Sequence, residues 1–91
     1  MSYKLLFTER AQNDAREHQK VGDRATLKKI KAILEELVEH PETGTGKVEQ
    51  LKYELAGCWS RRINREHRIV YNIDADAEVV TIFEMKSHYR R

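Results

Sequence analysis

The feature that most constrains the fold of this chain is an apolar repeat that stops at a proline. Apolar residues recur at spacings of three and four positions, and they are Leu27, Ile30, Ile33, Leu34, Leu37 and Val38. This spacing places all of them on one face of a helix. The pattern predicts a helix from Arg24 to His40, because Pro41 cannot continue it.

After Pro41 the pattern changes from helical to extended. Residues 42–46 form a flexible loop, and the remainder of the chain is rich in β-branched and aromatic residues. Turn signals divide this remainder at Ala56-Gly57, Asn64-Arg65 and Asp74-Ala75-Asp76. The composition and the turns together predict about three further strands in a meander.

The start of the chain predicts a strand followed by a thin helix. The apolar run 3–7 is too short for a helix, and Thr8 after it suits a helix N-cap. A helix from Glu9 to about Lys20 has only Ala11, Ala15 and His18 as its inner stripe. Gly22-Asp23 then provides a turn and the cap of the next helix.

This order of elements predicts one small domain of the α+β class. Ninety-one residues leave no room for a second domain, so we expect a single domain over residues 1–91. The N-terminal strand and the two helices are expected to pack on one face of a small, mainly antiparallel twisted sheet.

The distribution of charge along the chain says more about possible binding partners than the net charge does. Lys and Arg number 17 against 15 Asp and Glu, so the net charge of +2 does not by itself indicate a nucleic-acid-binding protein. The segment 59–68, however, holds four arginines against the single acid Glu66. A polyanion can dock on such a local concentration of positive charge.

The chain has one cysteine, Cys58, and therefore no intrachain disulfide. We interpret Cys58 as a small buried hydrophobe without a catalytic role. Neither a signal-peptide pattern nor an apolar run of membrane-spanning length is present, so we expect a cytoplasmic protein without a membrane partner.

Strand alternation predicts that several basic residues converge on one face of the sheet. Successive side chains of a strand point to opposite faces, so Trp59, Arg61 and Ile63 share one face, and Ser60, Arg62 and Asn64 share the other. If the apolar faces pack on the helices, then Arg62, Arg68, Lys86 and His88 can meet on the open face. Glu49 is expected at a strand entrance, where alternation is a weak guide.

Several of these residues also have a purely structural interpretation. Arg61 and Arg65 can be solvated surface residues, because exposed arginines contribute little by themselves. Trp59 is assigned to hydrophobic packing. The lysines of the second helix, Lys28, Lys29 and Lys31, lie toward its N-terminus, against the helix dipole. They either contact phosphates of a large RNA partner or form a solvated face.

Metal catalysis is not expected. The histidines show no HxxxH spacing, and the acidic residues form no obvious carboxylate cluster. We therefore expect neither a metal nor another cofactor.

The second half of the chain carries a long ordered pattern. It reads Gly46-Lys47, Glu49, Leu51-Lys52, then Leu55-Ala56-Gly57-Cys58-Trp59-Ser60-Arg61-Arg62-Ile63, Glu66-His67-Arg68-Ile69-Val70-Tyr71, and finally His88-Tyr89. In these residues the chain resembles the Txe/YoeB family of bacterial toxin–antitoxin modules, within the RelE/ParE superfamily. The resemblance implies a RelE-like microbial ribonuclease fold.

The resemblance further implies a toxin that enters the ribosomal A site and cleaves mRNA there without a metal. In this scheme the Glu49 carboxylate is the general base and His88 the general acid. Arg68, helped by Arg62, stabilises the transition state, and Tyr89 orients the substrate. The basic residues expected to contact RNA are Lys47, Lys52, Arg61, Arg65, Lys28, Lys29 and Lys31.

The expected partners are a cognate antitoxin of the YefM or Axe type, the ribosome and mRNA, with DNA met only through the antitoxin. The alternatives are a noncatalytic inhibitor of DNA gyrase of the ParE type, or a corepressor bound to its antitoxin. Glu49, Arg68 and His88 favour the nuclease, because a protein–protein inhibitor has no need of an acid–base pair beside arginines.

Overall fold

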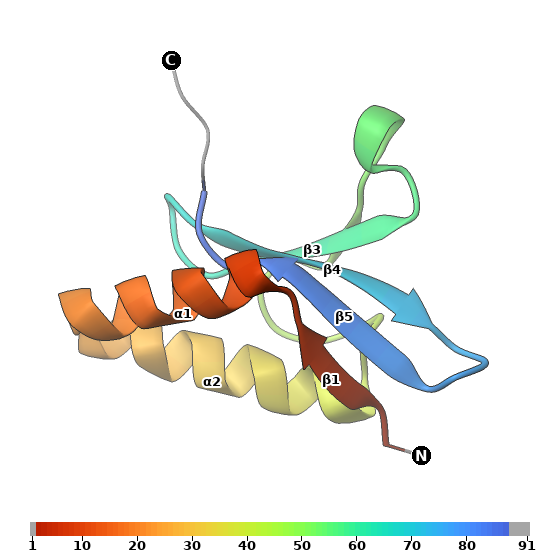
Figure 1. Ribbon diagram of the computed structural model, residues 1–91, viewed down its shortest axis with the longest axis horizontal. Helices are drawn as coiled ribbons and strands as arrows, with labels where there is room; N and C mark the ends of the chain where they lie inside the picture. Colours follow the sequence, from red (N-terminus) through yellow and green to blue (C-terminus); the bar gives the residue numbers. More distant parts are fainter. Residues whose placement is uncertain (1, 88–91) are drawn as a thin grey trace.

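The computed structural model describes residues 2–87, and in this range two helices lie against a five-stranded sheet (Figure 1). The first half contains β1 (Lys4–Phe7), α1 (Glu9–Val21) and α2 (Arg24–Glu39). The second half contains β2 (Glu49–Gln50), a 3-10 turn (Tyr53–Leu55), β3 (Cys58–Arg62), β4 (Arg68–Asp74) and β5 (Val79–Glu84).

Both helices begin at the capping residues that the sequence predicts. The Thr8 hydroxyl accepts a hydrogen bond from the Ala11 amide at 3.1 Å, and the Asp23 carboxylate accepts one from the Thr26 amide at 3.1 Å. Gly22 ends α1 in the left-handed conformation at φ 70°, which glycine adopts without steric cost. The second helix ends just before Pro41, as expected.

The sheet has the strand order β1-β5-β4-β3-β2. Among the strands of residues 2–87, the β1–β5 pair is parallel and the other three pairs are antiparallel. The register of β4 against β5 shifts next to Tyr71, because Tyr71 pairs with Ile82 whereas Val70 pairs with Glu84. Phe83 is therefore the extra residue of a β-bulge.

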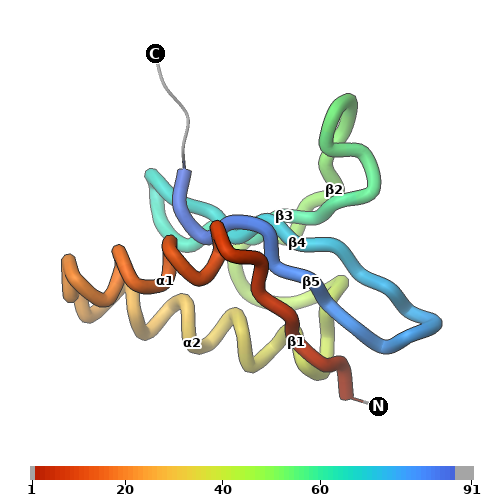
Figure 2. Tube along the Cα trace, in the orientation of Figure 1, coloured from red at the N-terminus to blue at the C-terminus, as the bar shows by residue number. Residues whose placement is uncertain are grey.

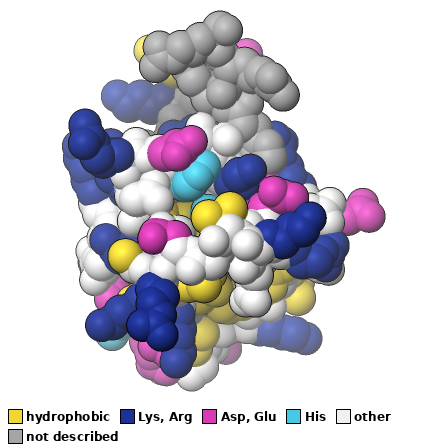
Figure 3. Space-filling model, turned by 90° about the vertical axis from the view of Figure 1, so that its left-hand side faces the viewer, with side chains coloured by type: hydrophobic (Ala, Val, Ile, Leu, Met, Phe, Trp, Pro, Cys, Tyr) yellow, Lys and Arg dark blue, Asp and Glu magenta, His cyan; other side chains and the backbone are white. Residues whose placement is uncertain are grey.

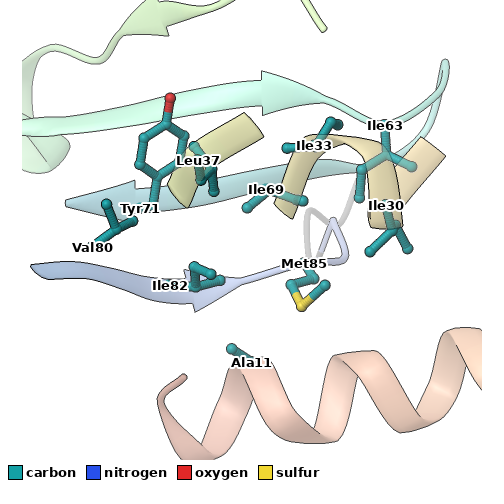
Figure 4. Close-up of a cluster of buried hydrophobic side chains, with 10 residues drawn as sticks. All are labelled: Ala11, Ile30, Ile33, Leu37, Ile63, Ile69, Tyr71, Val80, Ile82 and Met85. Carbon is teal, nitrogen blue, oxygen red and sulfur yellow. The ribbon is translucent and has the colours of Figure 1, made fainter. Parts of the chain in front are cut away.

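The hydrophobic core lies between the helices and one face of the sheet (Figure 4). Its buried members are Ala11, Ile30, Ile33, Leu37, Ile63, Ile69, Tyr71, Val80, Ile82 and Met85. Trp59 packs against this cluster, which confirms its structural assignment. The layered α+β arrangement, with both helices on one face of a mainly antiparallel sheet, is confirmed (Figures 1 and 2).

Two predictions about single side chains differ from the structure. The inner stripe of α1 includes Asp14, which is 3% exposed, while Ala15 is only half-buried. Cys58 is half-buried at the start of β3 rather than a core residue.

Neither helix within residues 2–87 combines the length and the hydropathy that crossing a membrane requires.

Candidate active site

The sheet face that the helices leave uncovered carries one carboxylate and two guanidinium groups. Glu49 of β2 lies opposite Ser60 of β3, and Arg62 of β3 lies opposite Arg68 of β4. Ser60 and Arg62 are two residues apart on one strand, so all these side chains share one face. Glu49, Arg62 and Arg68 are exposed. Of the residues predicted to meet on the open face, Arg62 and Arg68 lie together there, and Glu49 is at the start of β2.

Their spacing suits the binding of an anion. Directly opposed side chains have Cβ atoms about 4.5–5.5 Å apart, and diagonal neighbours such as Glu49 and Arg62 lie about 7–8 Å apart, within reach of long side chains. Arg62 and Arg68 are like charges placed directly across from each other, which destabilises the sheet in the absence of a counter-charge. A phosphate between them would relieve that repulsion and lie beside the Glu49 carboxylate.

A second carboxylate lies across the same face. Glu84 of β5 pairs with Val70 after the β-bulge, and Glu49 of β2 pairs with Ser60. Ser60 and Val70, each 3% exposed, pair with each other and lie between the two carboxylates. The Glu84 carboxylate lies 4.0 Å from Arg10 of α1. Alternation alone cannot locate Glu84 on β5, because the bulge changes the register.

The loop that precedes Glu49 packs tightly against β3 at Gly46. The Gly46 carbonyl accepts a hydrogen bond from the Arg62 amide. A Cβ on Gly46 would lie 2.8 Å from the Arg62 carbonyl oxygen, and φ is +93°. Both facts require glycine at this position. Gly46 therefore fixes the approach of the loop to the strand that carries Arg62.

Arg61 holds the same loop from the inside. Its side chain is fully buried, and its guanidinium donates to Glu36 Oε1 at 2.7 Å, to the Tyr71 hydroxyl at 3.2 Å, and to loop carbonyls. These carbonyls belong to His40, Thr43 and Thr45. The prediction that Arg61 contacts RNA is wrong, because no part of this side chain reaches the surface. Its role is to bind residues 40–45 to the core.

The groups around Arg61 complete a polar network. Glu36 also accepts from the Thr45 amide and hydroxyl, both at 2.7 Å, and these bonds, followed by Arg61, hold the pKa of Glu36 below its ordinary value. The Tyr71 hydroxyl donates to the Pro41 carbonyl at 2.7 Å, and burial raises the pKa of Tyr71. The network thus satisfies the buried cation with one carboxylate and several carbonyl groups.

The other predicted RNA-contacting residues divide into two groups. Lys47 and Lys52 flank β2 and are exposed, and Arg65 is exposed in the turn between β3 and β4. Lys28 and Lys31 are exposed and Lys29 is half-buried on α2, which covers the opposite face of the sheet (Figure 1). The structure therefore does not bring these helix lysines together with Arg62 and Arg68.

The C-terminal residues of the predicted site, His88 and Tyr89, lie outside the described residues. Lys86, which was expected beside Arg62 and Arg68, instead pairs with Glu17 of α1 at 3.9 Å. Lys86 follows the end of β5, where strand alternation no longer applies. Within residues 2–87, no group of three or more His, Cys, Asp or Glu side chains could hold a metal ion.

Comparison with known proteins places this chain in a family. The sequence profile described as a YoeB-like toxin of bacterial type II toxin–antitoxin systems matches residues 7–89. The chain belongs to this family. The Toxin YoeB of Synechocystis sp. is 42% identical to it over 97% of this chain and 99% of the relative. The Toxin YoeB of Escherichia coli K12 is 37% identical over 94% and 99% of the two chains.

Solved structures of YoeB-like toxins agree with this assignment. A YoeB/ParE toxin from Agrobacterium tumefaciens superposes with a TM-score of 0.85 at 34% identity, over 94% of this chain and 99% of that one. YoeB in a heterotetrameric YoeB–YefM complex from Staphylococcus aureus has a TM-score of 0.82 at 36% identity, over 98% and 100%. YafQ from E. coli, at 12% identity, shares the fold alone, with a TM-score of 0.78. The expected RelE-like fold and toxin family are confirmed, and the ParE alternative is not favoured.

Proposed function

We propose that this YoeB-like toxin is an endoribonuclease that cleaves mRNA in the ribosomal A site and so inhibits translation. The observation that carries the proposal is the exposed group formed by Glu49, Arg62 and Arg68 on the uncovered sheet face of a toxin of this family. A carboxylate beside two guanidinium groups is the set needed to move a proton next to a phosphodiester and to stabilise the resulting charge.

In the proposed reaction the Glu49 carboxylate removes the proton from a ribose 2′-hydroxyl. The 2′-oxygen attacks the adjacent phosphorus, and the bond from phosphorus to the 5′-oxygen of the next nucleotide breaks. Arg62 and Arg68 stabilise the extra negative charge on the phosphorane, where one well-placed donor contributes about 3 to 4 kcal/mol. His88 gives its proton to the departing 5′-oxygen, and Tyr89 orients the substrate. The products are a 2′,3′-cyclic phosphate and a 5′-hydroxyl.

Basic residues around the site would hold the RNA backbone. Lys47, Lys52 and Arg65 are exposed near the ends of the strands that carry the site, so they are placed to contact phosphates of the strand that enters it. Lys28, Lys29 and Lys31 face away from this strand. They would contact RNA only if the partner is large enough to surround the molecule, as a ribosome is.

We further propose that a YefM-like or Axe-like antitoxin silences the toxin by covering the same face. A YoeB toxin of Staphylococcus aureus has been solved in complex with YefM. An acidic antitoxin segment would neutralise Arg62 and Arg68 and exclude RNA from Glu49. DNA would be met only through the antitoxin, and ribosomes place the activity in the cytoplasm. A complex that abolished toxicity with both arginines still accessible would contradict this part.

Primer extension on an mRNA translated by purified ribosomes tests the activity. The wild-type chain should cut within codons, and cutting should disappear when ribosomes are omitted or when Glu49 is changed to Gln. An mRNA with a 2′-deoxynucleotide at the cut position should remain intact there, since the nucleophile is missing. Cleavage of that substrate would overturn the mechanism. Growth arrest without any cut would instead favour the noncatalytic gyrase-directed alternative.

A further inference from the structure

Three side chains hold residues 85–87 to the body of the molecule. Figure 3 shows one end of the molecule, where Lys, Arg, Asp and Glu side chains lie around a histidine side chain. The Met85 amide donates to Asp14 Oδ2 at 2.9 Å, and the Met85 carbonyl oxygen lies 2.7 Å from His18 Nε2. The Ser87 amide donates to His67 Nδ1 at 3.0 Å. Asp14 and His18 belong to α1, whereas His67 precedes β4. Two separate parts of the fold thus bind Met85 and Ser87, the first and last of these three residues.

The two bonds to Met85 are well shielded from water, and the bond between His67 and Ser87 is partly buried. Asp14 is 3% exposed, His18 6% and Met85 1%. The rings of His18 and His67 meet edge to face, with centroids 5.1 Å apart. Hydrogen bonds in such surroundings resist exchange with water, so the backbone from Met85 to Ser87 has a defined position and direction.

His67 can make its bond only in one protonation state. Since the Ser87 amide is the donor, Nδ1 must carry no proton, and the neutral ring then carries its proton on Nε2. Burial is the main cause that lowers the pKa of His67, opposed by Glu66, whose carboxylate lies 3.6 Å from Nε2. The charges of His18 and Lys86 lower the pKa further, and Asp14 raises it. Glu17 and Asp23 line the same pocket beside this ring.

We propose that Asp14, His18 and His67 are positioning residues of the cleavage reaction. They anchor residues 85–87 and thereby determine the position of His88 relative to the RNA. The proposal rests on the proposed function, in which His88 is the general acid. A general acid must lie within hydrogen-bond distance of the atom it protonates. A displacement of about 1 Å at the reacting groups can lower a rate by on the order of a hundredfold. The anchor ends one residue before His88, so a loosened anchor acts directly on that placement.

The substitutions His67→Ala and His67→Asn separate positioning from general stability. Alanine removes the acceptor, whereas asparagine places its Oδ1 close to the position of Nδ1 and can accept from the Ser87 amide without titrating. Under single-turnover conditions at saturating ribosomes, His67→Ala should cut mRNA on the order of ten- to a hundredfold more slowly, with unchanged affinity for ribosomes. His67→Asn should recover most of the rate. His40→Asn, an exposed histidine outside the anchor, is the matched control and should cut like wild type.

Amide hydrogen exchange tests the anchor without relying on activity. The Ser87 amide of the wild-type chain should be protected, and His67→Ala should lower its protection factor by roughly tenfold, whereas His67→Asn should not. Protection in the wild type should also fall as the pH drops through the lowered pKa of His67, and this loss should be absent in His67→Asn.

The possible failures are distinguishable. An unprotected Ser87 amide in the wild-type chain would overturn the anchor, even if His67→Ala does not fold. A folded His67→Ala that cuts at the wild-type rate would overturn its positioning role alone. A wild-type chain that never cuts mRNA on ribosomes would overturn the proposed function. The anchor would then have no role in catalysis, although hydrogen exchange could still detect it.

Discussion

At the scale of single residues, the neighbours Arg61 and Arg62 have opposite roles. They are adjacent on β3, so one side chain enters the core and the other faces solvent. Arg61 is fully buried and satisfied by Glu36, Tyr71 and loop carbonyls, while Arg62 remains exposed opposite Arg68. One arginine therefore stabilises the loop before β2, and the next is free to bind a phosphate.

The exposed arginines should matter for catalysis and little for stability. We expect Arg68→Gln to lower the single-turnover cleavage rate by about a hundredfold or more, since it removes a charge-stabilising donor. Its melting temperature should stay close to that of the wild type, because a surface substitution of this kind changes stability by about 0.5 kcal/mol or less. Arg16→Gln, on the exposed side of α1, is the matched control. Equal loss of rate in both variants would contradict a specific role for Arg68.

The buried arginine should show the reverse pattern. Arg61→Met removes the cation from a network that includes Glu36 and leaves several carbonyls unpaired, so we expect a loss of roughly 3 kcal/mol in the free energy of unfolding. Urea denaturation followed by circular dichroism measures this loss. Arg62→Met should lose about 0.5 kcal/mol or less in the same experiment. If the two variants unfold at the same urea concentration, the network does not stabilise the fold.

At the scale of elements, the loop from α2 to β2 determines where Glu49 lies. β2 has only two residues, so its pairing with β3 gives it little stability of its own. The loop is fixed instead by Arg61 and Glu36 inside and by Gly46 against Arg62. These contacts also explain why one acid, Glu36, lies in the last turn of α2 against the helix dipole. Its bonds to Thr45 and Arg61 are worth more than the unfavourable dipole interaction.

Two glycines provide a matched test of this loop. Gly46 and Gly57 both have φ +93°, but an added Cβ meets the Arg62 carbonyl at 2.8 Å in the first case and nothing within 4 Å in the second. Gly46→Ala should therefore lose more stability than Gly57→Ala, which carries only the backbone strain of about 1 kcal/mol. Urea unfolding of both variants measures the difference. Equal losses would mean that the contact with β3 relaxes easily.

At the scale of the whole molecule, the two faces of the sheet have different roles. The helices and the core occupy one face (Figures 1 and 4). The other face carries the candidate site. Titratable side chains also connect parts of the fold, since Glu36 joins α2 to β3, and the anchor formed by Asp14, His18 and His67 joins α1 and the approach to β4 to the end of β5. Global stability should therefore depend on pH.

Acid should destabilise the fold partly through Glu36. Its pKa lies below the ordinary value of 4.5 in the folded chain, so the unfolded chain binds more protons as the pH falls. This contribution is complete above about pH 4.5 and is lost as the pH drops through the folded pKa. Urea unfolding between about pH 3 and 7 spans the range in which carboxylates titrate. In this range the free energy of unfolding of Glu36→Gln should depend less on pH than that of the wild type. An unchanged slope would contradict this assignment.

The sequence by itself determined the helices, the capping residues, the class of fold and the uncovered face that carries Arg62 and Arg68. These follow from local periodicity, because the spacing of apolar residues is a property of the chain alone. Glu49 was correctly placed at a strand entrance. The pattern from Gly46 to Tyr71 was also sufficient to indicate the family that the comparisons confirm.

Only the tertiary structure decided the roles of residues whose partners are distant along the chain. Alternation already placed Arg61 on the core face, yet its burial depends on Glu36 and loop carbonyls that no local pattern reveals. Asp14 bonds to Met85 across 71 residues, and the bulge at Phe83 reverses the alternation before the C-terminus. Periodicity assigns a side chain to a face, but a buried charge or polar bond is stable only where packing brings its partner.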